Sequence, residues 1–431
     1  MTESEHRITT LDSGVRVVTE RVPSVRSVAL GFWIGTGSVM EPDEHAGMSH
    51  LLEHMLFRGT DRFASEEIDQ IFDGMGAEIN AGTGKETTSL YTRVLDRHLE
   101  RAFDVMSDML WRPRFGELEA EREVVLEEIA MYEDDPQDKV FDVLGEAVFG
   151  THPLGRAVIG RAEVVAAATR EDLTSFHAER YVPGNVVIAA AGSIDHDEVV
   201  RMAQAAGAER AGQPAPHSQQ QPPSPERRVR FVRKDTEQYH FCLGGPGISR
   251  EDERRFALRV LDNILGGTSS SRLFQEVRER RGLAYSVFSF SNHYASTGEV
   301  GLYVGTRPEN LTEALSVIAQ ELERFLADPI SEAELERSRE NVKGRVVLSL
   351  ESTAARMNRL GGSVLNELPI LSVDDVIEKI DAVQISDVHE LAQELFAPHM
   401  LSVAGVGADE DAFQAALVPM QAAIAAAGVA Q

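Results

Sequence analysis

The chain has 431 residues, of which 42% are hydrophobic and 6% aromatic, and its formal net charge is −28. This length is enough for two domains, each with its own core. The negative charge argues against nucleic-acid binding, which needs basic patches; it fits a solvated surface, and an acidic interior would also attract basic peptides. No run of 18 or more apolar residues predicts a membrane helix, so we expect no membrane partner.

The cysteine content bears on the cellular compartment. The single cysteine, Cys242, excludes an internal disulfide and a cysteine-based zinc site. The first seven residues, MTESEHR, lack the basic and apolar regions of a secretory signal. We therefore expect a cytoplasmic protein.

The first predicted elements are two β-like segments, residues 15–22 and 28–33. A helix follows around residues 48–57, where apolar residues recur with helical spacing and Gly59 predicts the end of the helix.

Three residues of that helix, His50, Glu53 and His54, share one face because they stand at i, i+3 and i+4. Two histidines four residues apart can bind one metal ion, and the carboxylate between them can hold an attacking water. Left unpaired, these polar groups would destabilise a buried helix, so metal ligation is the simplest explanation. The order H-x-x-E-H reverses the commoner H-E-x-x-H and is similar to that of the inverzincin metallopeptidases.

A third metal ligand must come from elsewhere, since catalytic zinc usually has three protein ligands and one open position. The acid-rich helix predicted over Glu117–Glu133 supplies several candidates. Glu121 and Glu128 are seven residues apart and share a face, whereas Glu127 and Glu133 point elsewhere. Spacing alone does not choose among them, because an acidic residue on a helix is ordinarily solvated.

The clearest break in the chain is a segment rich in Pro, Gln and Ser, which we predict to be a linker at 212–226. It separates an N-terminal domain, 1–211, from a C-terminal domain, 227–431.

The two halves look like weak repeats. The second half also opens with β-like segments, at 229–232 and 239–243, and each half closes with a helical stretch and a β-like run, 186–191 in the first and 401–406 in the second. Two α+β domains of one fold are therefore predicted. The metal motif is not duplicated: its counterpart near 258–267 has no pair of histidines, so the C-terminal domain is expected to be non-catalytic.

Four longer motifs occur in order along nearly the whole chain. They are HLLEHMLFRGT at 50–60, GAEINAGTGKETT at 76–88, EREVVLEE at 121–128 and GGTSSSRLFQEVRERRGLAYSV at 266–287. Together they resemble the pitrilysin family of metallopeptidases, which includes insulin-degrading enzyme, and the mitochondrial processing peptidase branch looks closest. The resemblance implies a zinc endopeptidase with two homologous domains, each a mainly antiparallel sheet packed with helices, that together form half of a clamshell.

The resemblance also implies roles for the residues of the first half. Glu128 would be the third ligand, so that each chain binds one Zn²⁺ with His50, His54 and Glu128. Glu121 would be a carboxylate behind these ligands that orients one of them and tunes its basicity. Glu53 would be the general base that takes a proton from the attacking water.

Residues 79–81 resemble the family's substrate-binding edge strand. An extended peptide would add to Asn80 and Ala81 through main-chain hydrogen bonds. A plain structural strand and turn is the alternative. Gly82 stands where many relatives carry an aromatic residue, which leaves the side-chain preference next to the cleaved bond open.

In the second half, Phe274, Arg278 and Tyr285 match family positions that contact the substrate. Arg278 and Tyr285 would hold a peptide carbonyl and help to stabilise the tetrahedral intermediate. From the residues alone, the favoured interpretation is that Arg278 is a surface charge beside Arg280 and Arg281 and that Tyr285 is a core aromatic.

Long relatives join two such units in one chain, whereas this chain is a single unit with both sets of residues. We therefore expect a homodimer whose enclosed chamber admits short unfolded peptides or presequence-like segments. One alternative is a non-catalytic subunit, which the retention of His50, Glu53, His54 and Glu128 disfavours. Another is a peptidase that needs a different partner chain.

Overall fold

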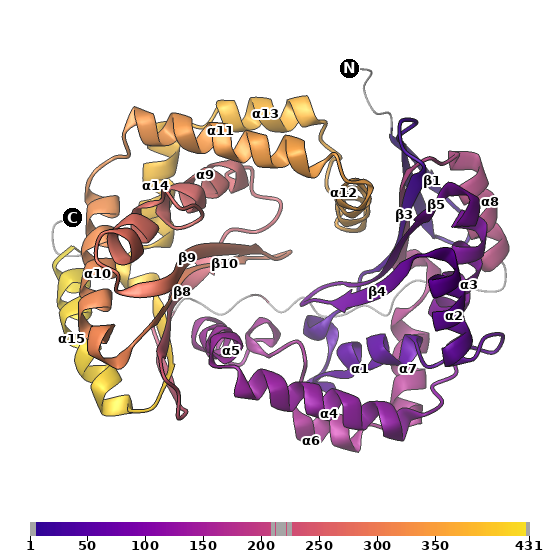
Figure 1. Cartoon of the computed structure of the whole chain (residues 1–431), viewed down its shortest axis with the longest axis horizontal. Helices are drawn as coiled ribbons and strands as arrows, with labels where there is room; N and C mark the ends of the chain where they lie inside the picture. The colour runs from indigo at the N-terminus through magenta and orange to yellow at the C-terminus, as the bar shows by residue number, and fades with distance from the viewer. Residues whose placement is uncertain (1–5, 208–211, 213–220, 222–225, 428–431) are drawn as a thin grey trace. The chain divides into compact units, whose positions relative to one another are not determined.

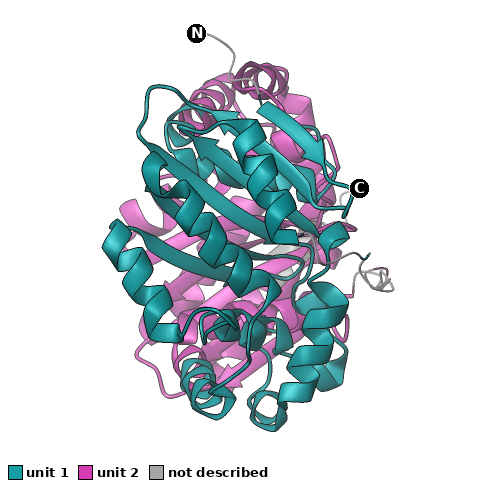
Figure 2. Ribbon diagram, turned by 90° about the vertical axis from the view of Figure 1, so that its right-hand side faces the viewer, with its two compact units in different colours: residues 1–129, 157–219, 347–370 teal, residues 130–156, 220–346, 371–431 magenta. Residues whose placement is uncertain are grey.

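The computed structural model describes residues 6–207, 212, 221 and 226–427. Most of the predicted linker, 212–226, therefore lies outside the described residues. The chain divides into two compact units, coloured separately in Figure 2. Unit 1 is formed by residues 1–129, 157–219 and 347–370, and unit 2 by residues 130–156, 220–346 and 371–431.

Unit 1 contains a six-stranded sheet, whose strand order is β1-β2-β6-β3-β5-β4. Only the β2–β6 pair is parallel; the other neighbouring pairs are antiparallel. Its strands are β1 (His6–Thr10), β2 (Arg16–Arg21), β3 (Ser27–Ile34), β4 (Glu78–Thr83), β5 (Thr88–Leu95) and β6 (Val186–Gly192). The predicted β-like segments of the first half are thus confirmed as β2, β3 and β6.

Unit 2 contains a five-stranded sheet with the order β7-β11-β8-β10-β9, in which only β7 and β11 are parallel. Its strands are β7 (Val229–Arg233), β8 (Tyr239–Gly247), β9 (Ala284–His293), β10 (Gly298–Thr306) and β11 (Ser402–Gly407). Taken in chain order, these five strands occupy the same places as β2 to β6 of unit 1. The shared topology confirms the predicted α+β fold with two related, mainly antiparallel domains.

Helices pack on both sheets (Figure 1). Those with residues in unit 1 are α1 (Met48–Leu56), α2 (Ser65–Met75), α3 (Leu99–Trp111), α4 (Leu118–Asp134), α6 (Ala162–Ala167), α7 (Arg170–Arg180), α8 (His196–Gly207) and α12 (Thr353–Leu365). Those of unit 2 are α5 (Pro136–Phe149), α9 (Arg255–Leu265), the π-helix η6 (Phe274–Glu279), α10 (Leu311–Ala327), α11 (Glu332–Ser349), α13 (Val373–Asp381), α14 (Ile385–Leu395) and α15 (Glu410–Ala427). The unit boundaries fall inside α4 and near the end of α11. Among the described residues, no helix is both long enough and apolar enough to span a bilayer.

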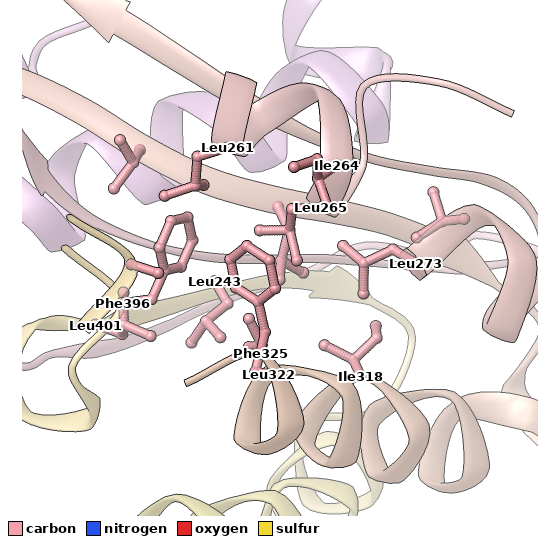
Figure 3. Close-up of a cluster of buried hydrophobic side chains, with 14 of the residues drawn as sticks. Leu243, Leu261, Ile264, Leu265, Leu273, Ile318, Leu322, Phe325, Phe396 and Leu401 are labelled. Carbon is pink, nitrogen blue, oxygen red and sulfur yellow. The ribbon is translucent and has the colours of Figure 1, made fainter. Parts of the chain in front are cut away.

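Each unit has its own hydrophobic core. In unit 1 the core lies between the sheet and helices that include α1 and α3. In unit 2, leucines of α9 and apolar residues of α10 pack against the sheet, as Figure 3 shows for Leu261, Leu265, Leu322 and Phe325 around Leu243 of β8. Both cores exclude water from large aliphatic and aromatic side chains, which is the main favourable term in folding.

The two halves of the sequence exchange one helix each. α12, from the second half, covers the face of the unit 1 sheet formed by Val18, Ala29 and Val187, where it buries Met357 and Leu360. α5, from the first half, packs on β8 and β11 of unit 2. The compact units therefore differ from the predicted ranges 1–211 and 227–431 by these two segments. The ranges were drawn at the linker, and the sequence carries no local signal of where a distant helix packs.

Candidate active site

Helix α1 separates its apolar residues from its metal-binding candidates. Buried Met48, Leu51, Leu52, Met55 and Leu56 recur with the spacing of one helical face and anchor the helix in the core of unit 1. His50, Glu53 and His54 therefore lie together on the remaining face, as predicted. The helix ends at Leu56, three residues before Gly59, so the predicted stop is placed slightly too late.

The structure brings His50, His54 and Glu128 together, with one ligand atom from each lying within 4.8 Å of the others. The Oε2 atom of Glu128 is 3.6 Å from His50 Nε2 and 3.2 Å from His54 Nε2. A tetrahedral zinc site with bonds of about 2.1 Å separates its ligand atoms by about 3.4 Å, so this donor set fits a zinc ion. Among the described residues, no other group of His, Cys, Asp and Glu converges in this way.

The protonation state of His50 also suits metal binding. Burial lowers its pKa to about 4, and the neighbouring His54 acts in the same direction. The side chain is only 12% exposed. His50 is therefore neutral at pH 7, and neutral imidazole is the form that binds a metal.

The extent of burial distinguishes Glu121 from Glu128, which the sequence spacing alone did not. Glu121 is 4% exposed at its side chain, whereas Glu128 is 31% exposed. Glu121 Oε1 accepts a hydrogen bond of 2.7 Å from His54 Nδ1, and its other oxygen pairs with Arg58. This contact directs Nε2 of His54 toward Glu128, which is the arrangement expected of a carboxylate behind a metal ligand. Glu127 and Glu133 are exposed.

The start of α1 is held by a buried glutamate outside the motif. Glu41 accepts hydrogen bonds from the backbone N–H of Gly47 at 2.9 Å and of Ser49 at 2.6 Å. Gly47 has φ +102°, and a Cβ atom there would lie 2.9 Å from the carbonyl oxygen of Ile159. Glu41 therefore supplies the negative charge that a helix N-terminus favours, where the N-cap residue has no side chain to do so.

Glu53 contacts the edge of the sheet. Thr83, the last residue of β4, donates a hydrogen bond of 2.5 Å to Glu53 Oε2. Burial raises the pKa of Glu53, while the bond from Thr83 acts in the opposite direction. A half-buried carboxylate with a raised pKa, beside a candidate metal site, is suited to accept and later release a proton.

Asn80 and Ala81 lie on an edge strand, as predicted, because β4 pairs only with β5 among the described strands. Asn80 is exposed and Ala81 is half-buried. The Asn80 side-chain oxygen accepts a hydrogen bond of 2.8 Å from the N–H of Ala81. Exposed Gly82 has open space where a Cβ atom would lie, so the strand is not crowded at this position.

In unit 2, Phe274, Arg278 and Tyr285 form one cluster. The guanidinium carbon of Arg278 lies 4.7 Å from the ring centre of Phe274 and 4.4 Å from that of Tyr285. Arg278 Nη1 also donates a hydrogen bond of 3.0 Å to the carbonyl oxygen of Tyr285. Tyr285 is 78% exposed, so its reading as a core aromatic is wrong.

Sequence reasoning missed Thr83 and Glu41. Thr83 lies within the GAEINAGTGKETT motif, and the alternation of β4 places it on the same face as half-buried Ile79 and Ala81, which is a usable signal. Glu41 offers no such signal, because it reaches the helix from six residues before its N-cap.

The sequence matches two family models. Residues 16–162 match the model described as insulinase, peptidase family M16, and residues 167–342 match the model described as peptidase M16 inactive domain.

Curated relatives match nearly the whole chain. A protein named uncharacterized zinc protease from Streptomyces coelicolor is 42% identical over 416 residues, which cover 94% of this chain and 91% of the relative. One of the same description from Bacillus subtilis is 42% identical over 389 residues, covering 90% and 95%. A probable mitochondrial-processing peptidase subunit beta from Arabidopsis thaliana is 31% identical over 422 residues, covering 94% and 79%.

Two solved structures share the fold. A peptidase M16 inactive domain from Pseudomonas fluorescens superimposes with a TM-score of 0.88 at 24% identity, covering 94% of this chain and 98% of that one. A protease from Helicobacter pylori also gives a TM-score of 0.88, at 21% identity, covering 94% and 100%.

Proposed function

Because the chain belongs to the M16 family of peptidases, we propose that it is a zinc-dependent endopeptidase that hydrolyses short unfolded peptides or presequence-like segments. The observation that carries this proposal is the convergence of His50, His54 and Glu128 at distances that fit a zinc ion. Glu53, on the same helix face, supplies the acid–base group that such a hydrolysis needs.

His50, His54 and Glu128 would hold the zinc, one ion per chain. Bound there, zinc supplies Lewis acidity, which polarises the scissile carbonyl and makes water a better nucleophile at neutral pH. Glu53 takes the proton of the attacking water on its carboxylate and passes it to the leaving amine. Thr83, by its bond to Glu53, positions the carboxylate for both transfers.

The edge of β4 would bind the peptide as an added strand. Main-chain hydrogen bonds give affinity without a strict sequence rule. In the structure the N–H of Ala81 donates to the side-chain oxygen of Asn80. A carbonyl oxygen of the bound peptide would take the place of that side-chain oxygen as the acceptor. Because Thr83 ends the same strand, a peptide along β4 runs toward Glu53.

We also propose that two copies of the chain assemble as a homodimer in the cytoplasm. Arg278 and Tyr285 of one subunit would then act on a peptide held at the zinc of the other. Mixing a Glu53→Gln variant with a Tyr285→Phe variant tests this. Recovered activity supports shared sites, and no recovery contradicts them.

The central experiment measures two quantities of the purified protein: its rate of cleavage of fluorescence-quenched peptides and its zinc content. We expect cleavage that a chelator abolishes and zinc restores. Glu53→Gln should retain zinc and lose activity by about 10²- to 10⁴-fold, since it removes the acid–base group. Glu127→Gln, an exposed change on α4, is the matched control. Activity that survives Glu53→Gln would exclude the mechanism, and a protein with zinc but no activity would be the non-catalytic subunit.

A further inference from the structure

A pocket of about 300 Å³ in unit 2 is lined by two arginines and by no carboxylate. Arg278 reaches it from η6, and Arg307 follows directly after β10. The other polar side chains of the lining include Gln238, Thr306 and Asn310. The lining side chains carry two positive charges and no negative one, in a chain whose net charge is −28. Outside the lining, Glu279 Oε1 lies 3.7 Å from Arg278 Nε.

The two arginines differ in how they are held. Arg278 is fixed between the rings of Phe274 and Tyr285 and by its bond to the Tyr285 carbonyl. Arg307 is 73% exposed at its side chain, and its Nη1 is 4.0 Å from Glu309 Oε1, at the outer limit of an ion pair. Glu309 is itself exposed and does not line the pocket. Arg307 is therefore available to a ligand, next to a pre-positioned guanidinium.

The segment that carries Arg307 is tied to the segment that carries Tyr285. Thr306 Oγ1 donates a hydrogen bond of 2.7 Å to the carbonyl oxygen of Leu283, and Asn310 Nδ2 donates one of 3.4 Å to the same oxygen. Arg307 lies between these two anchors in the sequence. The backbone position of Arg307 is thus set by the fold of unit 2.

We propose that this pocket binds a carboxylate of the peptide substrate and that Arg307 determines specificity there. The inference rests on the proposed peptidase function for the identity of its ligand. Guanidinium groups match carboxylates in shape and charge. The volume is at the low end for ligand sites, so it suits one acidic side chain or one chain terminus rather than a larger molecule.

The test uses the full chain and three quenched peptides of one parent sequence. The first has no acidic residue and an amidated C-terminus. The second adds one glutamate, scanned through the sequence, and the third has a free C-terminal carboxylate. The measured quantity is kcat/KM for each charged peptide divided by that for the neutral one. Variants are Arg307→Gln and Arg307→Glu, and Arg233→Gln, an exposed change at the end of β7, is the control.

We expect the ratio to fall about fivefold in Arg307→Gln, the scale of a solvent-accessible ion pair, and to remain at the wild-type value in Arg233→Gln. Arg307→Glu should lower the ratio further, because it places a negative charge opposite the carboxylate. If the ratio changes only for the second peptide, the ligand of the pocket is an acidic side chain. If it changes only for the third peptide, the ligand is the C-terminal carboxylate. Equal ratios in all variants would overturn the proposal.

The outcomes separate this inference from the proposed function. If cleavage depends on Glu53 but not on the charge at residue 307, the proposed peptidase function stands and the proposed carboxylate-binding role of the pocket is wrong. If no peptide is cleaved in a Glu53-dependent manner, the peptidase proposal fails. In that case the same peptides, labelled for fluorescence anisotropy, test the pocket independently of cleavage. The ratio of the Kd for each charged peptide to that for the neutral one is then compared between the wild type and the Arg307 variants.

Discussion

The carboxylate of Glu121 is almost fully buried; it accepts a hydrogen bond from His54 and forms an ion pair with Arg58. Glu121→Gln keeps the size of the side chain but removes its charge. We expect zinc affinity to fall about 10- to 100-fold, because the imidazole of His54 loses its orienting carboxylate. Competition with a chromogenic chelator measures this. Glu127→Gln serves as the control, and unchanged affinity in Glu121→Gln would contradict the role.

The contrast between Glu121 and Glu128 shows what the sequence could provide at this scale. Seven-residue spacing placed both on one face, and the family motif distinguished them by role. Their difference in exposure depends on what packs over each end of α4, which is a property of the folded chain. The motif residues of α1 were predictable because their spacing is local.

Among the elements, α1 depends on Glu41 for its N-terminus. Glu41→Gln leaves the backbone N–H groups of Gly47 and Ser49 without a charged acceptor. We expect a loss of about 1–2 kcal/mol in stability, as for the removal of a helix cap, and a lower thermal midpoint. Glu44→Gln, an exposed neighbour, should leave the midpoint unchanged. Equal midpoints for both variants would show that Glu41 does not anchor the helix.

Helix α11 gives a pH-dependent prediction. Burial alone would raise the pKa of Glu334, but hydrogen bonds from Arg272 and Ser331 outweigh it and lower the pKa to about 2. The ionised Glu334 carboxylate therefore contributes its full stabilisation of the folded state above about pH 4.5, the ordinary pKa of a glutamate. This contribution is lost as the pH falls toward 2.

Glu334→Gln should therefore lower the urea midpoint at pH 7, by an amount equivalent to about 2 kcal/mol at most, and the deficit should shrink below pH 4. Glu332→Gln, exposed in the same first turn, is the control. A deficit that stays constant from pH 7 to pH 3 would show that the carboxylate charge is not its cause.

The elements themselves were largely predictable, since period-two and helical patterns are local. β2, β3, β6, β7, β8 and β11 all lie where β-like runs of apolar residues predicted them. The packing partners of α5 and α12 were not predictable, because a helical pattern states that one face is buried and not which sheet covers it.

In the whole molecule, the exchange of α5 and α12 makes the sequence halves interdependent. Fully buried Glu20 of β2 pairs with both Arg356 and Arg359 of α12, and Met357 and Leu360 close the apolar face beside them. A chain of residues 1–211 would lack both arginine partners of Glu20 and would expose the apolar face that Met357 and Leu360 cover.

We therefore expect residues 1–211 expressed alone to aggregate or to lack a cooperative thermal transition. Co-expression with residues 227–431, which carry α12, should restore a soluble complex. Circular dichroism and size-exclusion chromatography measure both. A monomeric 1–211 fragment with a sharp transition would contradict the dependence.

The same exchange has a consequence for synthesis on the ribosome. Gly192 completes the last strand of the unit 1 sheet, but the helix that seals it begins only at Thr353. At ordinary elongation rates the sheet waits on the order of ten seconds with one apolar face uncovered. We therefore expect the nascent chain to be prone to chaperone binding over that interval, and slowing translation after residue 192 to lengthen the exposure rather than help the first half to fold.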